Sequence, residues 1–374
     1  MHSETDQTAY MQRALALARQ AEGRTSPNPL VGAVLVKQGR IIGEGFHHHA
    51  GAAHAEIEAL RAAGPAARDA TLFVTLEPCA HHGRTPPCTD AIIAAGVAEV
   101  IYAVGDPNPN VDRKGHAQLA VAGLRVRRGV CADDAHALNR PFFKYISTGR
   151  PFVTAKFAMS LDGKIATHTG DARWIAGAAA RRQGHQLRNV SDVILVGVGT
   201  VVADDPRLTT RLDQANSRHP LRVVVDSRGR APGSARLFDP TLPGQTVLAT
   251  TAAADADYCA QLRARGVEVW TVPADAHNRV SLPAVLDEIG RRKLLTVMVE
   301  GGGEVLGAFF TQRLVDRVWV FVAPIIIGGA RAPGPVGGQG AARLAQALHL
   351  DALQFETLDK DLWLQADVLP PKGG

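Results

Sequence analysis

The chain has 374 residues, and because a compact domain usually holds ~100–200 residues, this length predicts two globular domains. Its composition, 46% hydrophobic and 21% charged, excludes a disordered chain, and four cysteines are too few for a disulfide framework at this size. The net charge of +5 includes no block of like charges, and no long apolar run or signal peptide is recognisable, so we expect a cytoplasmic protein that binds neither nucleic acid nor membranes.

Hydrophobic periodicity in the first half predicts alternating strands and helices. Helices are expected at residues 8–21, 54–63 and 89–95, and strands at 30–36, 40–45, 71–76 and 99–104. A further helix is expected to end at Pro141-Phe142-Phe143, ahead of the turn cluster Thr148-Gly149-Arg150-Pro151. These signals predict one α/β domain over residues 1–147.

The same alternation starts again in the second half. Strands are expected at residues 193–198, 222–226, 246–250, 267–272, 296–299 and 315–323, and helices at 178–188, 258–265, 282–290 and 304–311. A new strand is also expected to begin at Phe152. Residues 148–374 are therefore predicted to form a second α/β domain rather than an extension of the first.

One group of residues in the first half has the composition of a catalytic zinc site. His54-Ala55-Glu56 opens a predicted helix, Pro78-Cys79 follows a strand, and Cys88 comes after a short loop. One histidine and two cysteines leave the fourth zinc position open for water, as catalytic zinc requires. Glu56 is then placed beside the metal as the general acid and base, in the manner of zinc deaminases. We regard Cys131 and Cys259, which lack such neighbours, as structural or incidental.

These motifs resemble those of the bifunctional riboflavin-biosynthesis deaminase/reductase family. The segments that carry the resemblance are Asn28-Pro29-Leu30-Val31-Gly32-Ala33-Val34, His54-Ala55-Glu56, the stretch from Glu77 to Cys88 and Asp106-Pro107-Asn108-Pro109. The resemblance implies a cytidine-deaminase-like three-layer domain that binds one Zn²⁺ through His54, Cys79 and Cys88. Arg113 stands where the family usually has glycine, which puts the geometry of that loop in question. His47 is a candidate substrate contact, whereas His48 and His49 are expected to be exposed.

The second half carries a glycine-rich turn that suits a phosphate. Glu300-Gly301-Gly302-Gly303 follows an apolar strand and precedes a predicted helix, so backbone amides and the helix dipole can hold an anion. From these residues alone, a tight strand-to-helix turn without a ligand is the alternative. Lys156 lies in an otherwise apolar strand, and it either orients the substrate or forms a structural ion pair.

The stretch from Lys156 to Ile165, together with Trp174-Ile175, the segment 199–209 and Val225-Asp226-Ser227, resembles the reductase half of the same family. The resemblance implies a dihydrofolate-reductase-like α/β domain that uses NADPH. The implied cofactor contacts are Ala158, Trp174, Thr200, Asp204, Ser227, Gly302, Gly303, Glu304, Val305, Leu306, Gly307 and Ala308. The implied substrate contacts are Lys156, Arg188, Leu208, Arg211 and Glu300. Ala172 replaces a serine that the family often has, so any side-chain contact there is lost.

The resulting hypothesis is a bifunctional enzyme. Its substrate is expected to be a phosphorylated pyrimidine ribotide that is deaminated in the first domain, after which its ribosyl group is reduced with NADPH in the second. A homodimer formed through the reductase domain is expected from the resemblance. The alternatives are a nucleic-acid base deaminase, for which stacking aromatics are too sparse, an inactive binding protein, and an active deaminase with a degenerate reductase.

Overall fold

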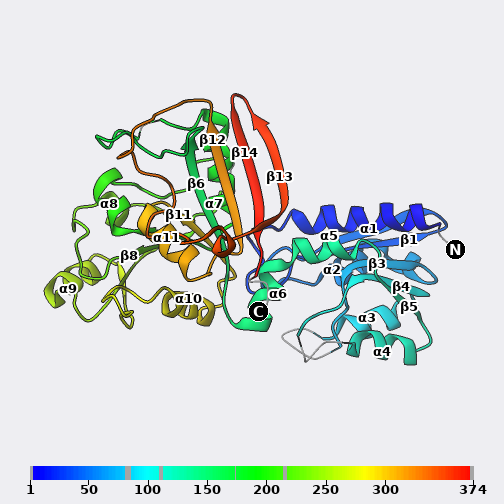
Figure 1. The fold of residues 1–374 in the computed structure, drawn as a ribbon. Coiled ribbons are helices and arrows are strands. Elements are labelled where there is room, and N and C mark those ends of the chain that lie inside the picture. Colours follow the sequence, from blue (N-terminus) through cyan, green and yellow to red (C-terminus); the bar gives the residue numbers. More distant parts are fainter. Residues whose placement is uncertain (1–2, 81–85, 109–112, 173, 214–216, 371–374) are drawn as a thin grey trace. The chain divides into compact units, whose positions relative to one another are not determined.

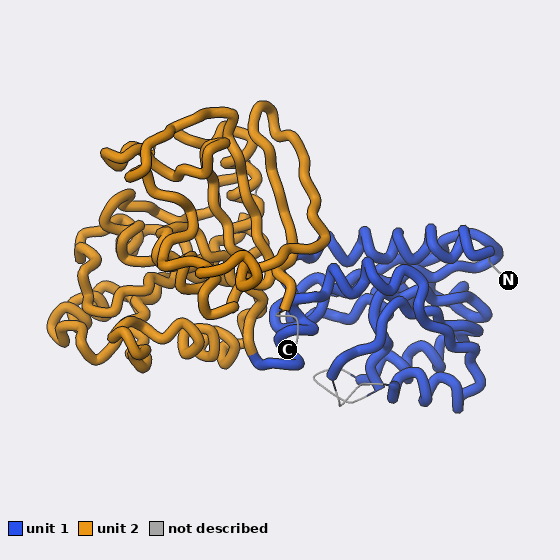
Figure 2. The backbone as a smooth tube through the Cα atoms, viewed as in Figure 1, with its two compact units in different colours: residues 1–149 blue, residues 150–374 orange. Residues whose placement is uncertain are grey.

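The computed structural model describes residues 3–80, 86–108, 113–172, 174–213 and 217–370. The chain divides into two compact units, Met1–Gly149 (unit 1) and Arg150–Gly374 (unit 2), as Figure 2 shows. This division lies close to the boundary expected after residue 147. In the described part of the chain, no helix is both long and apolar enough to cross a membrane.

Unit 1 is built around a sheet with the strand order β2-β1-β3-β4-β5. Its elements in chain order are α1 (Glu4–Arg19), β1 (Gly32–Lys37), β2 (Arg40–Phe46), α2 (Ala55–Ala63), the 3₁₀ turn η1 (Gly64–Ala67), β3 (Thr71–Leu76), α3 (Cys88–Ala94), β4 (Glu99–Val104), α4 (Lys114–Val121), β5 (Arg125–Arg128), α5 (Ala132–Leu138) and α6 (Arg140–Thr148). Strands β1 and β2 form an antiparallel hairpin, whereas β3, β4 and β5 run parallel to one another.

Both faces of this sheet are buried, because its strands alternate their apolar side chains between two cores. Val34 of β1 packs in a core that includes residues of α1 and α5, and the next residue, Leu35, packs in a core with α2, α3 and α4. Figure 1 shows the helices on the two faces. The predicted three-layer architecture is confirmed. Helix α2 lies close to β2 because Gly45 has no side chain: a Cβ there would lie 2.5 Å from the carbonyl oxygen of Ala55.

Unit 2 is built around a second sheet, with the strand order β10-β9-β8-β7-β11-β6-β12-β14-β13. Its elements in chain order are β6 (Phe152–Ser160), α7 (Ala178–Val190), β7 (Val193–Gly197), α8 (Val198–Asp204), β8 (Leu221–Val225), η2 (Arg236–Phe238), β9 (Thr246–Thr250), α9 (Ala256–Ala264), β10 (Glu268–Thr271), α10 (Leu282–Arg291), β11 (Thr296–Glu300), α11 (Gly303–Thr311), β12 (Arg317–Ala323), η3 (Leu344–Gln346), β13 (Leu350–Leu358) and β14 (Asp361–Val368). The strands from β6 to β12 pair in parallel, and β14 and β13 then add antiparallel.

Parallel strands end at one edge of a sheet, and ligands of open α/β sheets bind at that carboxyl edge. The strands β7, β8 and β11 end at Gly197, Val225 and Glu300, immediately before three of the segments that the sequence predicts to bind ligands. The mixed α/β fold predicted for this half is confirmed.

One local prediction is wrong. Pro141 does not end a helix but lies in the first turn of α6, where its missing amide hydrogen costs nothing. Gly149 ends this helix instead, with a positive φ of 71°.

Candidate active sites

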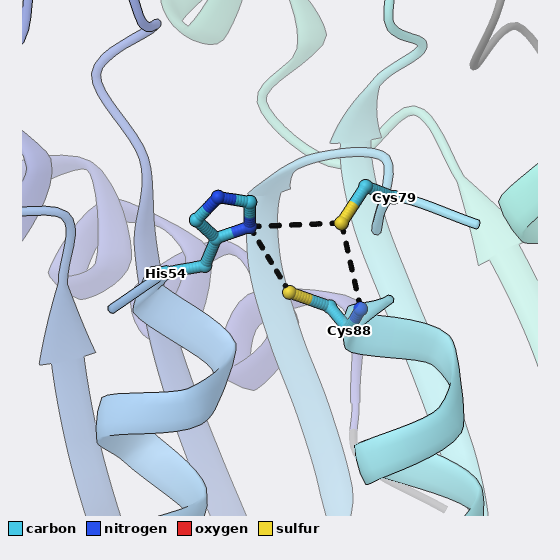
Figure 3. A group of neighbouring side chains, drawn as sticks. All are labelled: His54, Cys79 and Cys88. Carbon is cyan, nitrogen blue, oxygen red and sulfur yellow. Dashed lines mark hydrogen bonds between the residues drawn. The ribbon is translucent and has the colours of Figure 1, made fainter. Parts of the chain in front are cut away.

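The expected zinc ligands converge in unit 1 (Figure 3). His54 is the N-cap residue of α2, Cys79 follows β3 and Cys88 begins α3. The Nδ1 atom of His54 lies 3.2 Å from the Sγ atom of Cys88 and 3.6 Å from that of Cys79, and all three atoms lie within 4.8 Å of one another. This donor set fits a catalytic zinc ion, because one imidazole nitrogen and two sulfurs leave a fourth position open. Residues 81–85 of the intervening loop lie outside the described residues.

Burial and hydrogen bonding shift the pKa values of Cys79 and Glu56 in this site. A hydrogen bond with the side chain of Cys88 lowers the pKa of Cys79, and the backbone amide of Cys88, which donates to the Cys79 sulfur over 3.4 Å, acts in the same direction. Glu56, in the first turn of α2, is only 4% exposed, and this burial raises the pKa of its carboxyl group to about 7. The site therefore combines a thiol group whose deprotonated form is favoured with a carboxyl group whose protonated form is favoured.

His47 lies beside this cluster, with its ring edge-on to that of His54 at a centroid distance of 5.6 Å. Its Nδ1–H donates to the carbonyl oxygen of Ala53, so its Nε2 accepts from the side-chain amide of Asn28, both at 3.0 Å. Burial lowers the pKa of His47, consistent with a neutral ring. Both ring nitrogens are therefore engaged within the protein, whereas His48 and His49 are exposed as expected.

Glu77 is a supporting residue that sequence reasoning missed. Its buried carboxylate accepts hydrogen bonds from the backbone amides of Arg113, at 3.2 Å, and His116, at 3.0 Å, and so joins the Pro-Cys segment to the start of α4. Arg113 adopts the left-handed φ of 57° that a glycine would favour, so the backbone shape survives the substitution. Gly115 lets α4 approach the Pro-Cys segment closely, because a Cβ at this position would clash with the carbonyl oxygen of Pro78. The one sequence feature that could have drawn attention to Glu77 is its position directly before Pro78-Cys79.

In unit 2, a cavity of about 720 Å³ lies at the carboxyl ends of β7 and β8 and at the start of α11. Among the expected cofactor contacts, it is lined by Ser227, Gly302, Gly303, Glu304, Val305 and Ala308. Gly301 and Gly302 have positive φ values of 95° and 77°, and Gly302 caps α11. This turn leaves backbone amides at a helix N-terminus uncovered by side chains, which fits the phosphates of a dinucleotide.

The other expected cofactor contacts are placed differently. The hydroxyl of Thr200 lies against the glycine turn, 3.2 Å from where a Cβ of Gly302 would be. Leu306 packs in the core, and a Cβ on Gly307 would lie 2.3 Å from the carbonyl oxygen of Gly337, so neither lines the cavity. The remaining three are Ala158, half-buried on β6, Asp204, exposed at the end of α8, and Trp174, 74% exposed beside Arg181.

Three of the expected substrate residues contact one another. The Glu300 carboxylate accepts from Lys156 Nζ at 2.8 Å through one oxygen, and from Arg188 Nη2 at 2.6 Å through the other. Burial alone would raise the pKa of Glu300, but the charges of Arg188 and Lys156 outweigh burial and lower it. The ion pair that the sequence left as one alternative for Lys156 is therefore present.

The last two substrate candidates lie near this ion-pair group. Arg188 also donates to the carbonyl oxygen of Thr209, and Arg211 donates to the hydroxyl of the same residue over 3.3 Å. The Arg211 side chain is exposed, whereas the Leu208 side chain is buried in the core, so any substrate contact from Leu208 must come from its backbone. His185, which the sequence did not single out, accepts from the Arg211 amide; burial, with help from the two arginines, lowers its pKa to about 4.

Comparison with known proteins supports the assignment of both halves. Residues 4–104 match the family model of the cytidine and deoxycytidylate deaminase zinc-binding region, and residues 151–364 match that of the RibD C-terminal domain. The riboflavin biosynthesis protein RibD of Bacillus amyloliquefaciens is 43% identical over 96% of this chain and 95% of its own length.

The chain belongs to the RibD family.

The RibD of Escherichia coli strain K12 is 41% identical, covering 95% of this chain and 97% of its own length. The solved structure of Acinetobacter baumannii RibD superimposes with a TM-score of 0.87 at 37% identity, covering 98% of this chain and 100% of that one. A deaminase/reductase from Thermotoga maritima, named for diaminohydroxyphosphoribosylaminopyrimidine and 5-amino-6-(5-phosphoribosylamino)uracil, gives 0.85 at 35% identity over the same shares.

Family membership establishes the two activities. The chain is a bifunctional deaminase and reductase of riboflavin biosynthesis, with a zinc-binding deaminase domain and a RibD-type reductase domain. Its cofactors are Zn²⁺ and NADPH. The reductase match through residue 364 argues against a nucleic-acid deaminase with an unrelated accessory domain.

Proposed function

We propose that unit 1 removes an exocyclic amine from a phosphorylated ribosylaminopyrimidine, and that unit 2 then reduces the ribosyl group of the product to ribityl. The substrate class is supported by the name of the Thermotoga maritima protein, which matches this chain over nearly its full length. The observation that carries the proposal is the convergence of one imidazole nitrogen and two sulfurs beside a buried glutamate in a RibD-family chain.

His54, Cys79 and Cys88 would hold the zinc ion, which when bound acts as a Lewis acid and lowers the pKa of a water molecule. The role that falls to Glu56 is proton transfer. It follows His54 by two residues in the first turn of α2, so its carboxylate can take a proton at the open side of the ligand group and return it to the departing amine nitrogen. Its burial excludes bulk water from competing for that proton.

In unit 2, the cavity would seat NADPH with its diphosphate on the amides of Gly302–Glu304. Lys156 and Arg188 hold Glu300 ionised at the carboxyl end of β11, so its oxygens are fixed acceptors for the hydroxyl groups of an open-chain ribosyl substrate. The exposed guanidinium of Arg211 is suited to the phosphate of that substrate.

The deaminase assignment is tested with Glu56→Gln, which keeps the shape of the side chain but not its basicity. We expect one zinc per chain, measured by atomic absorption, in both the parent and the variant. Ammonia release from the pyrimidine ribotide should fall by at least ~100-fold, the lower range of general acid–base contributions. Release at the parental rate would remove Glu56 from the mechanism, and loss of zinc would make it a structural residue.

A homodimer through unit 2 forms part of the same proposal. Strand β13 lies at the edge of the described sheet and exposes apolar side chains, among them Leu353, 62% exposed, and Phe355, 72% exposed. Phe355→Glu should convert a dimer to monomers in sedimentation velocity, whereas Val121→Glu, at a 90% exposed site in unit 1, should not. A parent that sediments as a monomer at micromolar concentration would contradict this assignment.

We also propose a cytoplasmic location. It is supported by the free state of Cys79, Cys88, Cys131 and Cys259, which is usual in a reducing compartment. Recovery of the native chain from a secreted or membrane fraction would contradict it.

A further inference from the structure

Residues 208–211 of unit 2, which we call the substrate segment, include two of the expected substrate contacts but form no helix or strand. Within the described residues, the backbones of Thr209, Thr210 and Arg211 form no hydrogen bond with another backbone group. Leu208 has a positive φ of 54°, a conformation that is uncommon for residues other than glycine. The path of this segment therefore depends on the side chains packed around it rather than on regular secondary structure.

Two histidines accept hydrogen bonds from consecutive amides of the substrate segment. The Nδ1 atom of His219 accepts from the amide of Thr210 over 3.2 Å, and the Nδ1 atom of His185 accepts from the amide of Arg211 over 3.4 Å. His185 lies on α7, whereas His219 lies two residues before the start of β8. The two hydrogen bonds therefore join the substrate segment to two separate parts of unit 2.

A third side chain holds the segment from α7. Arg188 follows His185 by three residues on this helix, so both side chains lie on the same face. Arg188 donates to the carbonyl oxygen of Thr209 over 3.1 Å, while its other nitrogens are bonded to Glu300. Each of three consecutive residues thus has one backbone group bonded to a side chain from outside the segment.

The two histidine contacts require rings that carry no proton on Nδ1, because an amide N–H can donate only to an unprotonated ring nitrogen. Burial lowers the pKa of His185 to about 4, and two neighbouring arginines act in the same direction. Burial also lowers the pKa of His219. Both rings are therefore neutral at physiological pH, the form in which Nδ1 can accept.

We propose that His185 and His219 are positioning residues of the reductase, which hold the substrate segment so that Arg211 can bind the phosphate of the substrate. This inference rests on the function proposed for Arg211 and adds the two residues that fix its backbone. A side chain binds more tightly when its backbone is already held in the bound position, because less conformational freedom is lost on binding. Loss of either histidine acceptor should therefore weaken substrate binding and leave the chemical step unchanged.

The test measures KM and kcat for the deaminated substrate in the full-length enzyme at saturating NADPH. His185→Leu and His219→Leu each remove one acceptor and should raise this KM roughly three- to tenfold, the effect of one hydrogen bond. Their kcat should change less than about twofold, as expected when binding alone is weakened. His349→Leu, at an exposed histidine of unit 2, is the matched control and should leave both values unchanged.

Asparagine distinguishes the hydrogen bond from the bulk of the ring. Its side-chain oxygen stands as many bonds from the backbone as the histidine Nδ1 atom and also accepts, so His185→Asn and His219→Asn should keep the parental KM within about twofold. Glutamine carries its oxygen one bond farther out, so His185→Gln and His219→Gln should raise KM as leucine does. The glutamine variants also take the place of the leucine variants if an apolar side chain prevents folding.

Arg211→Ala separates failure of this inference from failure of the proposed function. Loss of a guanidinium that binds phosphate should raise the substrate KM at least about tenfold. An unchanged KM in Arg211→Ala would overturn the proposed role of Arg211 itself. If Arg211→Ala raises KM but the leucine and glutamine variants keep the parental value, or if asparagine raises KM as much as leucine, the positioning role of the histidines is overturned.

Discussion

Replacing Glu300 by glutamine should destabilise unit 2, because it leaves Lys156 and Arg188 as partly buried cations without a counter-charge. Breaking one partner of a buried ion pair typically costs about 3–5 kcal/mol. The three side chains here remain 12–16% exposed, and glutamine can still accept one hydrogen bond, so we expect about 2–3 kcal/mol. For a unit of this size, that loss corresponds to a fall in Tm of roughly 5–10 °C.

Tryptophan fluorescence measures this effect in unit 2 alone, since all four tryptophans of the chain lie there: Trp174, Trp270, Trp319 and Trp363. Urea is the appropriate denaturant, because guanidinium chloride would screen the charges. Glu304→Gln, at an exposed carboxylate of the first turn of α11, is the control and should cost less than about 1 kcal/mol. Lys156→Met and the double variant Lys156→Met/Glu300→Gln complete a double-mutant cycle, which isolates the coupling energy between Lys156 and Glu300.

The stability difference between the parent and Glu300→Gln should also depend on pH, in a direction that follows from the pKa of Glu300. The folded-state pKa of Glu300 is lowered, so its contribution to the free energy of unfolding is complete above the ordinary glutamate pKa of about 4.3. It is lost as the pH falls from there toward the lower folded-state pKa. The difference between the parent and Glu300→Gln should therefore stay constant from about pH 8 to pH 5 and narrow below. A difference under about 0.5 kcal/mol at neutral pH, or one that widens in acid, would refute the reasoning.

Two further predictions concern the support of the zinc site. Gly115→Ala should push α4 away from Pro78, lower the free energy of unfolding by about 1–3 kcal/mol and lower the temperature at which zinc is released. Gly105→Ala is the control and should behave like the parent, because its Cβ would lie 3.7 Å from the nearest side chain. Equal zinc-release temperatures for the two variants would contradict this. Arg113→Gly should raise the zinc-release temperature, because it relieves about 1 kcal/mol of left-handed backbone strain; a fall would show that contacts of the arginine side chain outweigh the strain.

Sequence reasoning selected His54, Cys79 and Cys88 as candidate zinc ligands because metal chemistry dictates both residue type and spacing, and the structure brings the three side chains together. His54 and the two cysteines are rare residues, and no ordinary packing role requires that combination. It missed Glu77 because the partners of its carboxylate are backbone amides 36 and 39 residues away, which leave no trace in residue type. It also left Lys156 undecided, since its partner Glu300 is 144 residues distant and becomes adjacent only when β6 pairs with β11.

Strand β13 was not predicted, because its apolar and polar residues alternate only over residues 353–356, a run too short to indicate a strand of nine residues.

The most direct test of the bifunctional assignment incubates the pure enzyme with the diaminopyrimidinone ribotide, with and without NADPH, and identifies the products by mass spectrometry. Without NADPH, the product should be the substrate in which one amine is exchanged for oxygen, accompanied by ammonia. With NADPH, that product should gain two hydrogens on its ribosyl group, with stoichiometric oxidation of the cofactor. Recovery of unchanged ribotide under both conditions, from enzyme that contains one zinc per chain, would contradict the account.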